Sequence, residues 1–182
     1  METVLPDVKH CACFTGHRPS KFPFDTQNRA YLDIFLSTVY LLAYDAITLK
    51  QINTFYCGMQ VGMDIWAGKQ ILMLKSFFPD TKLVCVSPFE REVESRHGND
   101  LDDYLFLKKN CDEFIALEKN YSSGCYTRRN SFMVERSGYV IAALSDERSG
   151  TSQTIRYARR LGRDIHIIDL KQFAVDHLFK TI

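Results

Sequence analysis

The turn Ser149-Gly150-Thr151 is the part of this 182-residue sequence best suited to hold a small anion. It follows the apolar run 139–144, which is too short for an independent helix and is typical of a strand buried on both faces. Ser149 or Thr151 would cap the next helix. The free N–H groups and positive dipole end of such a helix suit a phosphate, so we expect Gly150, Thr151 and Thr154 to supply amide and hydroxyl donors.

Arg129 and Asn130 precede the same strand, at the predicted start of a helix. A guanidinium there could pair with two oxygens of a phosphate bound at Gly150. On this hypothesis Arg129 is exposed in a cleft, and Arg129→Ala weakens binding while thermal stability stays nearly unchanged. The other interpretation is a structural arginine that ties the helix to the edge of the sheet.

Gly16, His17 and Arg18 directly follow the predicted strand 11–14. Open α/β sheets bind ligands just beyond the carboxyl ends of their strands, so these residues are candidates for binding. A solvated surface turn is the alternative. Another polar segment, 87–90, follows the predicted strand 82–86 and adds Pro88 and Glu90 to the candidates.

Gly58 and Gly62 flank a second strand-to-helix turn, after the predicted strand 54–57. Glycines four residues apart permit a backbone cradle for a phosphate or a ribose, although the spacing departs from the dinucleotide-binding fingerprint. Asp64 then falls in the first turn of the helix. It would either complement the helix dipole or bind a ribose hydroxyl, and the sequence does not separate the two.

The elements that position these residues alternate regularly between strand-like and helix-like patterns. The expected strands are 11–14, 54–57, 82–86, 113–117, 139–144 and 164–168. Such alternation predicts an α/β fold with a doubly wound, mostly parallel sheet and helices on both faces. We expect one domain over 1–182, with 1–9 as a loose lead-in.

Charge, hydropathy and cysteine content indicate which partners and which cellular location to expect. The net charge of +1 gives no bulk argument for nucleic acid, which we therefore disfavour as a partner without excluding it. No apolar run approaches the ~20 residues of a spanning helix, and no leader sequence is recognised, so we expect a cytoplasmic protein without a membrane partner. Six cysteines without a Cys-x-x-Cys pair favour buried, reduced thiols and no metal site.

With these motifs in view, the chain resembles the YpsA-like branch of the SLOG superfamily. The matching segments are 15–19, 58–64, 87–90, 129–134 and 149–154, in the expected order. The resemblance implies a Rossmann-like fold and a nucleotide-derived ligand, such as a relative of ADP-ribose, at the carboxyl edge of the strands. The superfamily also includes the Lonely Guy phosphoribohydrolases and the DNA-processing A proteins.

One departure from the Lonely Guy pattern bears on catalysis. Those enzymes carry a glutamate where Thr154 stands here, and an Arg-Lys pair where this chain has Arg129-Asn130. A neutral hydroxyl cannot replace that carboxylate, although Glu90 or Asp64 could substitute for it. We therefore expect a ligand sensor or regulator without catalysis and without a cofactor. A phosphoribohydrolase and a single-stranded DNA-binding protein are the alternatives, and homodimer assembly is left open.

Overall fold

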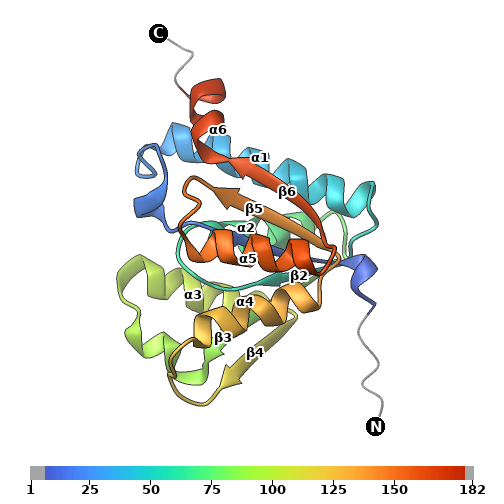
Figure 1. The fold of residues 1–182 in the computed structure, drawn as a ribbon, viewed down its shortest axis with the longest axis vertical. Coiled ribbons are helices and arrows are strands. Elements are labelled where there is room, and N and C mark those ends of the chain that lie inside the picture. The colour runs from blue at the N-terminus through green and yellow to red at the C-terminus, as the bar shows by residue number, and fades with distance from the viewer. Residues whose placement is uncertain (1–6, 179–182) are drawn as a thin grey trace.

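The computed structural model describes residues 7–178, and its centre is a single six-stranded sheet (Figure 1). The strands are β1 (Cys11–Gly16), β2 (Thr54–Cys57), β3 (Lys82–Phe89), β4 (Glu113–Glu118), β5 (Tyr139–Leu144) and β6 (Asp164–Asp169). All five strand pairings are parallel. The predicted α/β class and parallel sheet are thereby confirmed.

The strand order β4-β3-β2-β1-β5-β6 places β1 between β2 and β5. The chain builds outward from β1 to β4 on one side, then crosses back to add β5 and β6 on the other. Loops leaving the carboxyl ends of β1 and β5 therefore diverge to opposite faces. This divergence opens a crevice at the point where parallel α/β sheets bind their ligands.

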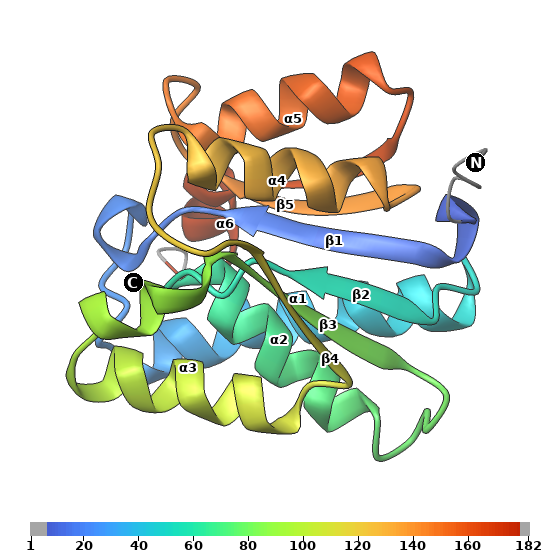
Figure 2. The same cartoon turned by 90° about the horizontal axis from the view of Figure 1, so that it is seen from below.

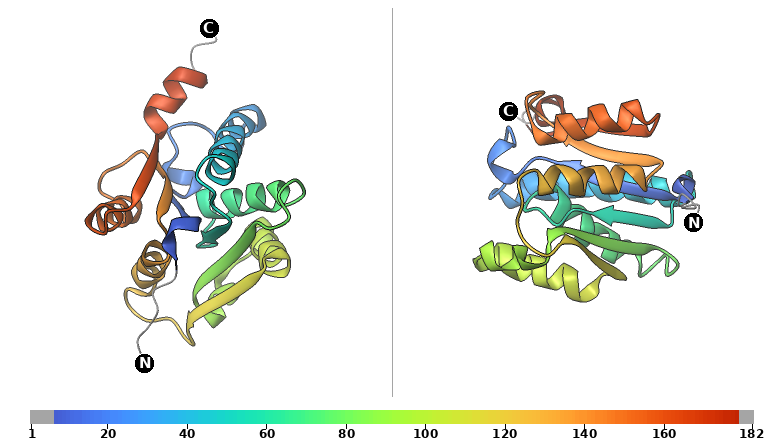
Figure 3. Two further views of the ribbon diagram at one scale, coloured as in Figure 1. Left: turned by 90° about the vertical axis from the view of Figure 1, so that its right-hand side faces the viewer. Right: turned by 60° about the horizontal axis from the view of Figure 1, so that its bottom comes forward.

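Helices cover both faces of the sheet (Figures 2 and 3). One layer contains α1 (Arg29–Thr48), α2 (Met63–Leu74) and α3 (Gly98–Asn110), and the other contains α4 (Cys125–Glu135) and α5 (Gly150–Arg160). The final helix, α6 (Leu170–His177), packs Phe173 against Phe35 of α1. Each layer encloses its own apolar core, centred on Phe14 and Phe55 in the first and on Val86 and Val140 in the second.

Helix α1 differs from the prediction that no apolar segment is long enough to span a membrane. By length and composition it could cross a membrane, since an 18-residue window has a mean hydropathy of 1.3 and only 22% of that window is buried. A core helix of a globular domain meets the same criterion. Four positions at helical spacing, Phe35, Val39, Ala43 and Ala46, are buried and place α1 on the sheet.

Strand β3 is longer than the sequence predicts. It continues through the expected polar turn to Phe89, and Pro88 is buried inside it. Ser87 and Phe89 pair with β4, whereas β2 has already ended at Cys57, opposite Cys85. Pro88 has no N–H to donate, and it is tolerated because no strand lies on that side.

Two other boundaries also differ from the predictions. The charged segment 91–96, for which the sequence is compatible with an exposed loop or a half-helix, lies largely in the 3-10 helix η3 (Glu90–Ser95), and both Glu92 and Arg96 are buried. Helix α4 begins at Cys125 after Gly124, whose positive φ of 79° suits glycine, so Arg129 lies inside the helix and not at its start. Of the predicted lead-in, residues 1–6 lie outside the described part, and Val8–His10 form a short 3-10 helix, η1.

The cysteines are unpaired thiols. Cys13, Cys57 and Cys85 are buried, as their apolar flanks predict.

Candidate functional site

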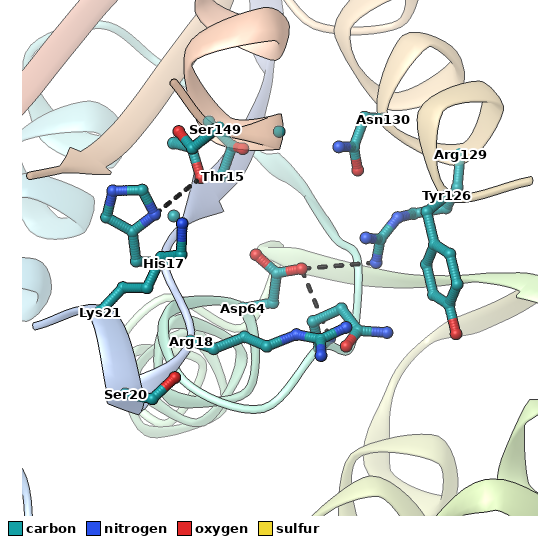
Figure 4. Close-up of a pocket in the computed structure, with 14 residues that line it drawn as sticks. Thr15, His17, Arg18, Ser20, Lys21, Asp64, Tyr126, Arg129, Asn130 and Ser149 are labelled. Atoms are coloured by element: carbon teal, nitrogen blue, oxygen red, sulfur yellow. Dashed lines mark hydrogen bonds and ion pairs between the residues drawn. The ribbon is translucent and has the colours of Figure 1, made fainter. Parts of the chain in front are cut away.

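A cavity of about 440 Å³ opens at the carboxyl ends of β1 and β5. Its wall brings together eight of the predicted site residues: Gly16, His17, Arg18, Asp64, Arg129, Asn130, Gly150 and Thr151. Figure 4 shows the side chains of His17 and Arg18 from the loop after β1, Asp64 from α2, and Arg129 and Asn130 from α4 around this cavity. The remaining candidates, Gly58, Gly62, Pro88, Glu90 and Thr154, lie outside this lining.

The N-terminus of α5 forms one side of the cavity. Ser149 caps the helix, because its hydroxyl accepts from the backbone N–H of Ser152 at 3.2 Å. The amides of Gly150 and Thr151 belong to the first turn and have no acceptor within the helix. Both residues line the cavity, and a Cβ built on Gly150 meets nothing within 4 Å, so the start of α5 is accessible. The arrangement is suited to an anion.

The opposite side is held by a buried ion pair between Arg129 and Asp64, 3.4 Å apart. Arg129 is only 3% exposed, and it also donates to the backbone carbonyl of Gly58. Burial raises the pKa of the Asp64 carboxyl even though Arg129 opposes the shift. The interpretation of Arg129 as an exposed cleft arginine is therefore wrong, and the structural alternative fits the burial and these contacts.

Arg129 nevertheless keeps one donor unused. Its Nε is buried and has no hydrogen-bond partner among the described residues, although the side chain lines the cavity. Arg96 and Arg163 also have a buried Nε without a partner, and neither lines the cavity, so the contribution of Arg129 to the site is the charge of its guanidinium. Asp64 also faces the cavity, with the Arg129 and Gln60 interactions drawn to one of its two oxygens (Figure 4).

The two glycines of the β2–α2 loop make room for neighbouring groups and do not cradle a ligand. A Cβ on Gly58 would collide with the Arg129 guanidinium and lie 2.6 Å from Asp64 Oδ2. Gly62 has a φ of 97°, and a Cβ there would lie 2.6 Å from the carbonyl oxygen of His17. Both glycines thus position Asp64 and the β1 loop from behind the cavity wall.

His17 links the β1 loop to the segment that leads into α5. Its Nε2 accepts from the backbone N–H of Asp146 at 3.2 Å, which places the ring proton on Nδ1, 3.5 Å from Thr151 Oγ1. Burial, assisted by Lys21, lowers the pKa of His17. The ring is therefore neutral at pH 7 and acts as a positioning group for Thr151 and the start of α5.

Free positive charge comes from the β1 loop. Arg18 is exposed, extends toward Tyr126, and forms no ion pair within residues 7–178 (Figure 4). Lys21 lies 3.7 Å from Asp146. Among the described lining residues, Asp64 is the only acid and it faces Arg129. The cavity is consequently cationic, although the chain as a whole is nearly neutral.

Thr154 and Asn130 connect α4 to α5. Asn130 Nδ2 donates to Thr154 Oγ1 at 3.1 Å, and that hydroxyl donates to the carbonyl of Gly150 at 2.9 Å. Thr154 borders a second hollow between the two helices. Its hydroxyl is thus engaged in holding the helix pair.

The polar segment 87–90 after β3 supports the site indirectly, through the neighbouring residue Glu92, which the sequence does not single out. Glu90 is exposed, whereas Glu92 accepts from Gln60 Nε2, Ser87 Oγ and Arg96 Nη2 at 2.7, 2.8 and 3.0 Å. Arg96 also donates to the carbonyl of Met59 at 2.8 Å. This buried network fixes the β2–α2 loop. The i, i+4 spacing of Glu92 and Arg96 was the available signal.

Three kinds of comparison, with a family model, with curated proteins and with solved structures, place the chain among known proteins. The sequence model of the YspA SLOG family matches residues 12–176. The chain belongs to the YspA SLOG family. Its curated relatives include UPF0398 proteins of Bacillus cereus (strain B4264) and Bacillus thuringiensis (strain Al Hakam), each 26% identical over 98 residues and matched over 53% of either chain. The match thus spans about half the length of these relatives.

Two solved structures share the fold. DNA processing protein A from Helicobacter pylori, described for its single-stranded DNA binding mode, has a TM-score of 0.60 at 16% identity, covering 96% of this chain and 75% of that one. DNA processing protein A from Streptococcus pneumoniae has a TM-score of 0.57 at 14% identity, covering 91% and 56%. At these identities the likeness shows a common Rossmann-like fold.

Proposed function

We propose that this protein binds the phosphate of a nucleotide or nucleotide derivative, of the ADP-ribose class, in the cavity at the ends of β1 and β5. The observation that carries the proposal is the N-terminus of α5 in the wall of a cavity that Arg18 and Arg129 also line. The free amides of Gly150 and Thr151 would hold phosphate oxygens, and Arg18 would add a charge-assisted contact. The cavity-facing oxygen of Asp64 would accept from a ribose hydroxyl.

Under this proposal, the protein is a sensor or regulator without catalysis. A phosphoribohydrolase needs a carboxylate beside the glycosidic bond, and Thr154 stands where the Lonely Guy enzymes have one. Asp64 is already engaged by Arg129. Single-stranded DNA is the second candidate, favoured by the fold shared with the Helicobacter pylori protein.

Calorimetric titration with AMP and ADP-ribose tests the proposal. Wild type should bind at least one of them, and Arg18→Ala should weaken binding about 10- to 150-fold, the usual effect of one charged hydrogen bond. Its melting temperature should not change, because Arg18 is exposed. Arg29→Ala on α1, the same charge change away from the cavity, should leave affinity unaltered.

Two results would count against the proposal. Absence of binding by either nucleotide, with binding of a single-stranded oligonucleotide, would favour the DNA-binding candidate. Release of adenine from AMP, followed by chromatography, would overturn the non-catalytic part.

A further inference from the structure

A second hollow of about 450 Å³ lies between α4 and α5 and meets the first cavity. The two share Tyr126, Asn130 and Gly150 in their walls. The junction is therefore the start of α5, where the phosphate of the proposed ligand would lie. Each hollow is within the size range of small-ligand sites, roughly 300–1,000 Å³. A mononucleotide in the first cavity leaves the second one empty.

The second hollow is rich in cationic and aromatic groups. Arg156 and Arg160, one helical turn apart on α5, both line it, and neither forms an ion pair within residues 7–178. Arg156 Nη1 donates to Ser152 Oγ at 2.6 Å, which holds its side chain along the helix. Helix α5 contains no acidic residue. Two unneutralised guanidinium groups at this spacing match a phosphorylated group better than an apolar one.

Aromatic rings supply flat surfaces in the same hollow. Tyr126 stands at the junction, and Tyr157 lines the far part, with the Arg160 guanidinium 5.4 Å from its ring centre. The Tyr157 hydroxyl is fixed by Glu135 at 2.6 Å. Oriented tyrosines and arginine planes are the groups on which nucleobases stack.

From this geometry we propose that the α4–α5 hollow is a second subsite of the same ligand site. It takes a second nucleoside or ribose-phosphate unit, joined through the phosphate held at the start of α5. This inference rests on the proposed function and adds to it where the second unit of a two-unit ligand binds, which is the α4–α5 hollow. The linkage is either a pyrophosphate, as in ADP-ribose, or a phosphodiester, as in a dinucleotide.

Calorimetry on the full chain with AMP, ADP-ribose and the dinucleotide pdApdA tests the subsite. Wild type should bind one of the two-unit ligands at least about 10-fold more tightly than AMP, as one additional charged contact provides. The ligand that gains identifies the linkage. The double variant Arg156→Ala/Arg160→Ala should lose that gain, while its affinity for AMP stays within about twofold.

Arg159→Ala is the matched control, because Arg159 is exposed on the same helix and lies outside the hollow. It should bind all three ligands like wild type. Arg156→Gln/Arg160→Gln keeps hydrogen-bonding groups at both positions and serves if the alanine variant unfolds.

The outcomes separate the two proposals. If AMP binds but neither two-unit ligand binds more tightly, the subsite is refuted and the phosphate site stands. An equal loss of AMP and two-unit affinity in the double variant would also refute it. If none of the three ligands binds wild type, both proposals are overturned.

Discussion

Arg129 and Asp64 form a buried ion pair, and the loss of either partner leaves a charge without its counterpart. We expect Arg129→Ala to lower the free energy of unfolding by about 3–5 kcal/mol, because Asp64 and the Gly58 carbonyl both lose their donor. Urea denaturation measures the change. Arg128→Ala, which removes an exposed arginine paired with Glu118 at the surface, should have a clearly smaller effect.

This expectation reverses the sequence-based one, in which Arg129→Ala leaves stability nearly unchanged. The sequence predicts that Arg129 lies close to the Ser149-Gly150-Thr151 turn, and the structure confirms that both line one cavity. The sequence does not reveal that Arg129 is buried, because its burial depends on Gly58, 71 residues away, which leaves room for the guanidinium. Equal stability of the Arg129→Ala and Arg128→Ala variants would contradict the buried pair.

His17 gives the stability of the protein a pH dependence in the acidic range. Its pKa is lowered from the ordinary value of 6.5, so the folded state favours the neutral ring. The stabilisation is complete above pH 6.5 and is lost as pH falls through the lower folded-state value. Protonation would place an N–H against the Asp146 amide, which is itself a donor.

We therefore expect wild type to lose stability between pH 7 and pH 5, as measured by urea denaturation at each pH. His17→Gln should lose less over the same range, because an amide oxygen can accept from Asp146 and does not titrate. Parallel pH profiles for the two proteins would show that His17 does not contribute.

At the scale of elements, the two strand-to-helix turns use glycine for different reasons. Gly58→Ala would push a methyl group against Arg129 and Asp64, so we expect a loss of several kcal/mol of stability. Gly150→Ala adds its methyl group to open space in the first turn of α5, where alanine is favoured over glycine by up to about 1 kcal/mol.

Thermal unfolding should therefore show a lower melting temperature for Gly58→Ala and an equal or higher one for Gly150→Ala. If the proposed site is correct, AMP titration should show weaker binding by Gly150→Ala, since the methyl group adds bulk to the cavity wall that Gly150 lines. A Gly150→Ala protein that melts several degrees below wild type would mean that this turn is structural.

Element boundaries show where sequence reasoning succeeds and where it stops. The strand starts at Thr54 and Tyr139 could be predicted because short apolar runs end sharply at polar residues. The end of β3 could not, since Ser87-Pro88 reads as a turn unless one knows that β2 ends at Cys57. The buried Glu92–Arg96 pair was missed for a related reason, because a charged run normally indicates a solvated surface.

At the scale of the whole molecule, the strand order decides which motifs meet. Alternation of strands and helices predicts a parallel sheet, and each polar turn at a strand end is then a candidate. Only the turns after β1 and β5 flank the point where the strand order reverses. They form the cavity together with α2 and α4. The turn after β3 lies two strands from β1, which explains why Pro88 and Glu90 are outside the cavity lining.

The six thiols differ in their exposure to solvent in this fold. Cys13, Cys57, Cys85 and Cys125 are buried, whereas Cys11 and Cys111 are partly exposed. We expect a chromogenic disulfide reagent at pH 7.5 to modify two thiols in the native protein and all six in guanidinium chloride. A hydrogen bond with Cys85 lowers the pKa of Cys111 to about 7, and burial raises the pKa of Cys11.

Because the thiolate is the reactive form, Cys111 should account for the faster of the two native reactions. The rate of that reaction should fall as pH drops below 7, and Cys111→Ser should abolish it while the slower reaction remains. Rapid modification of three or more thiols without denaturant would mean that β1, β2 and β3 are not packed between two helical layers. Persistence of the fast reaction in Cys111→Ser would instead assign it to Cys11 and contradict the order of the two pKa values.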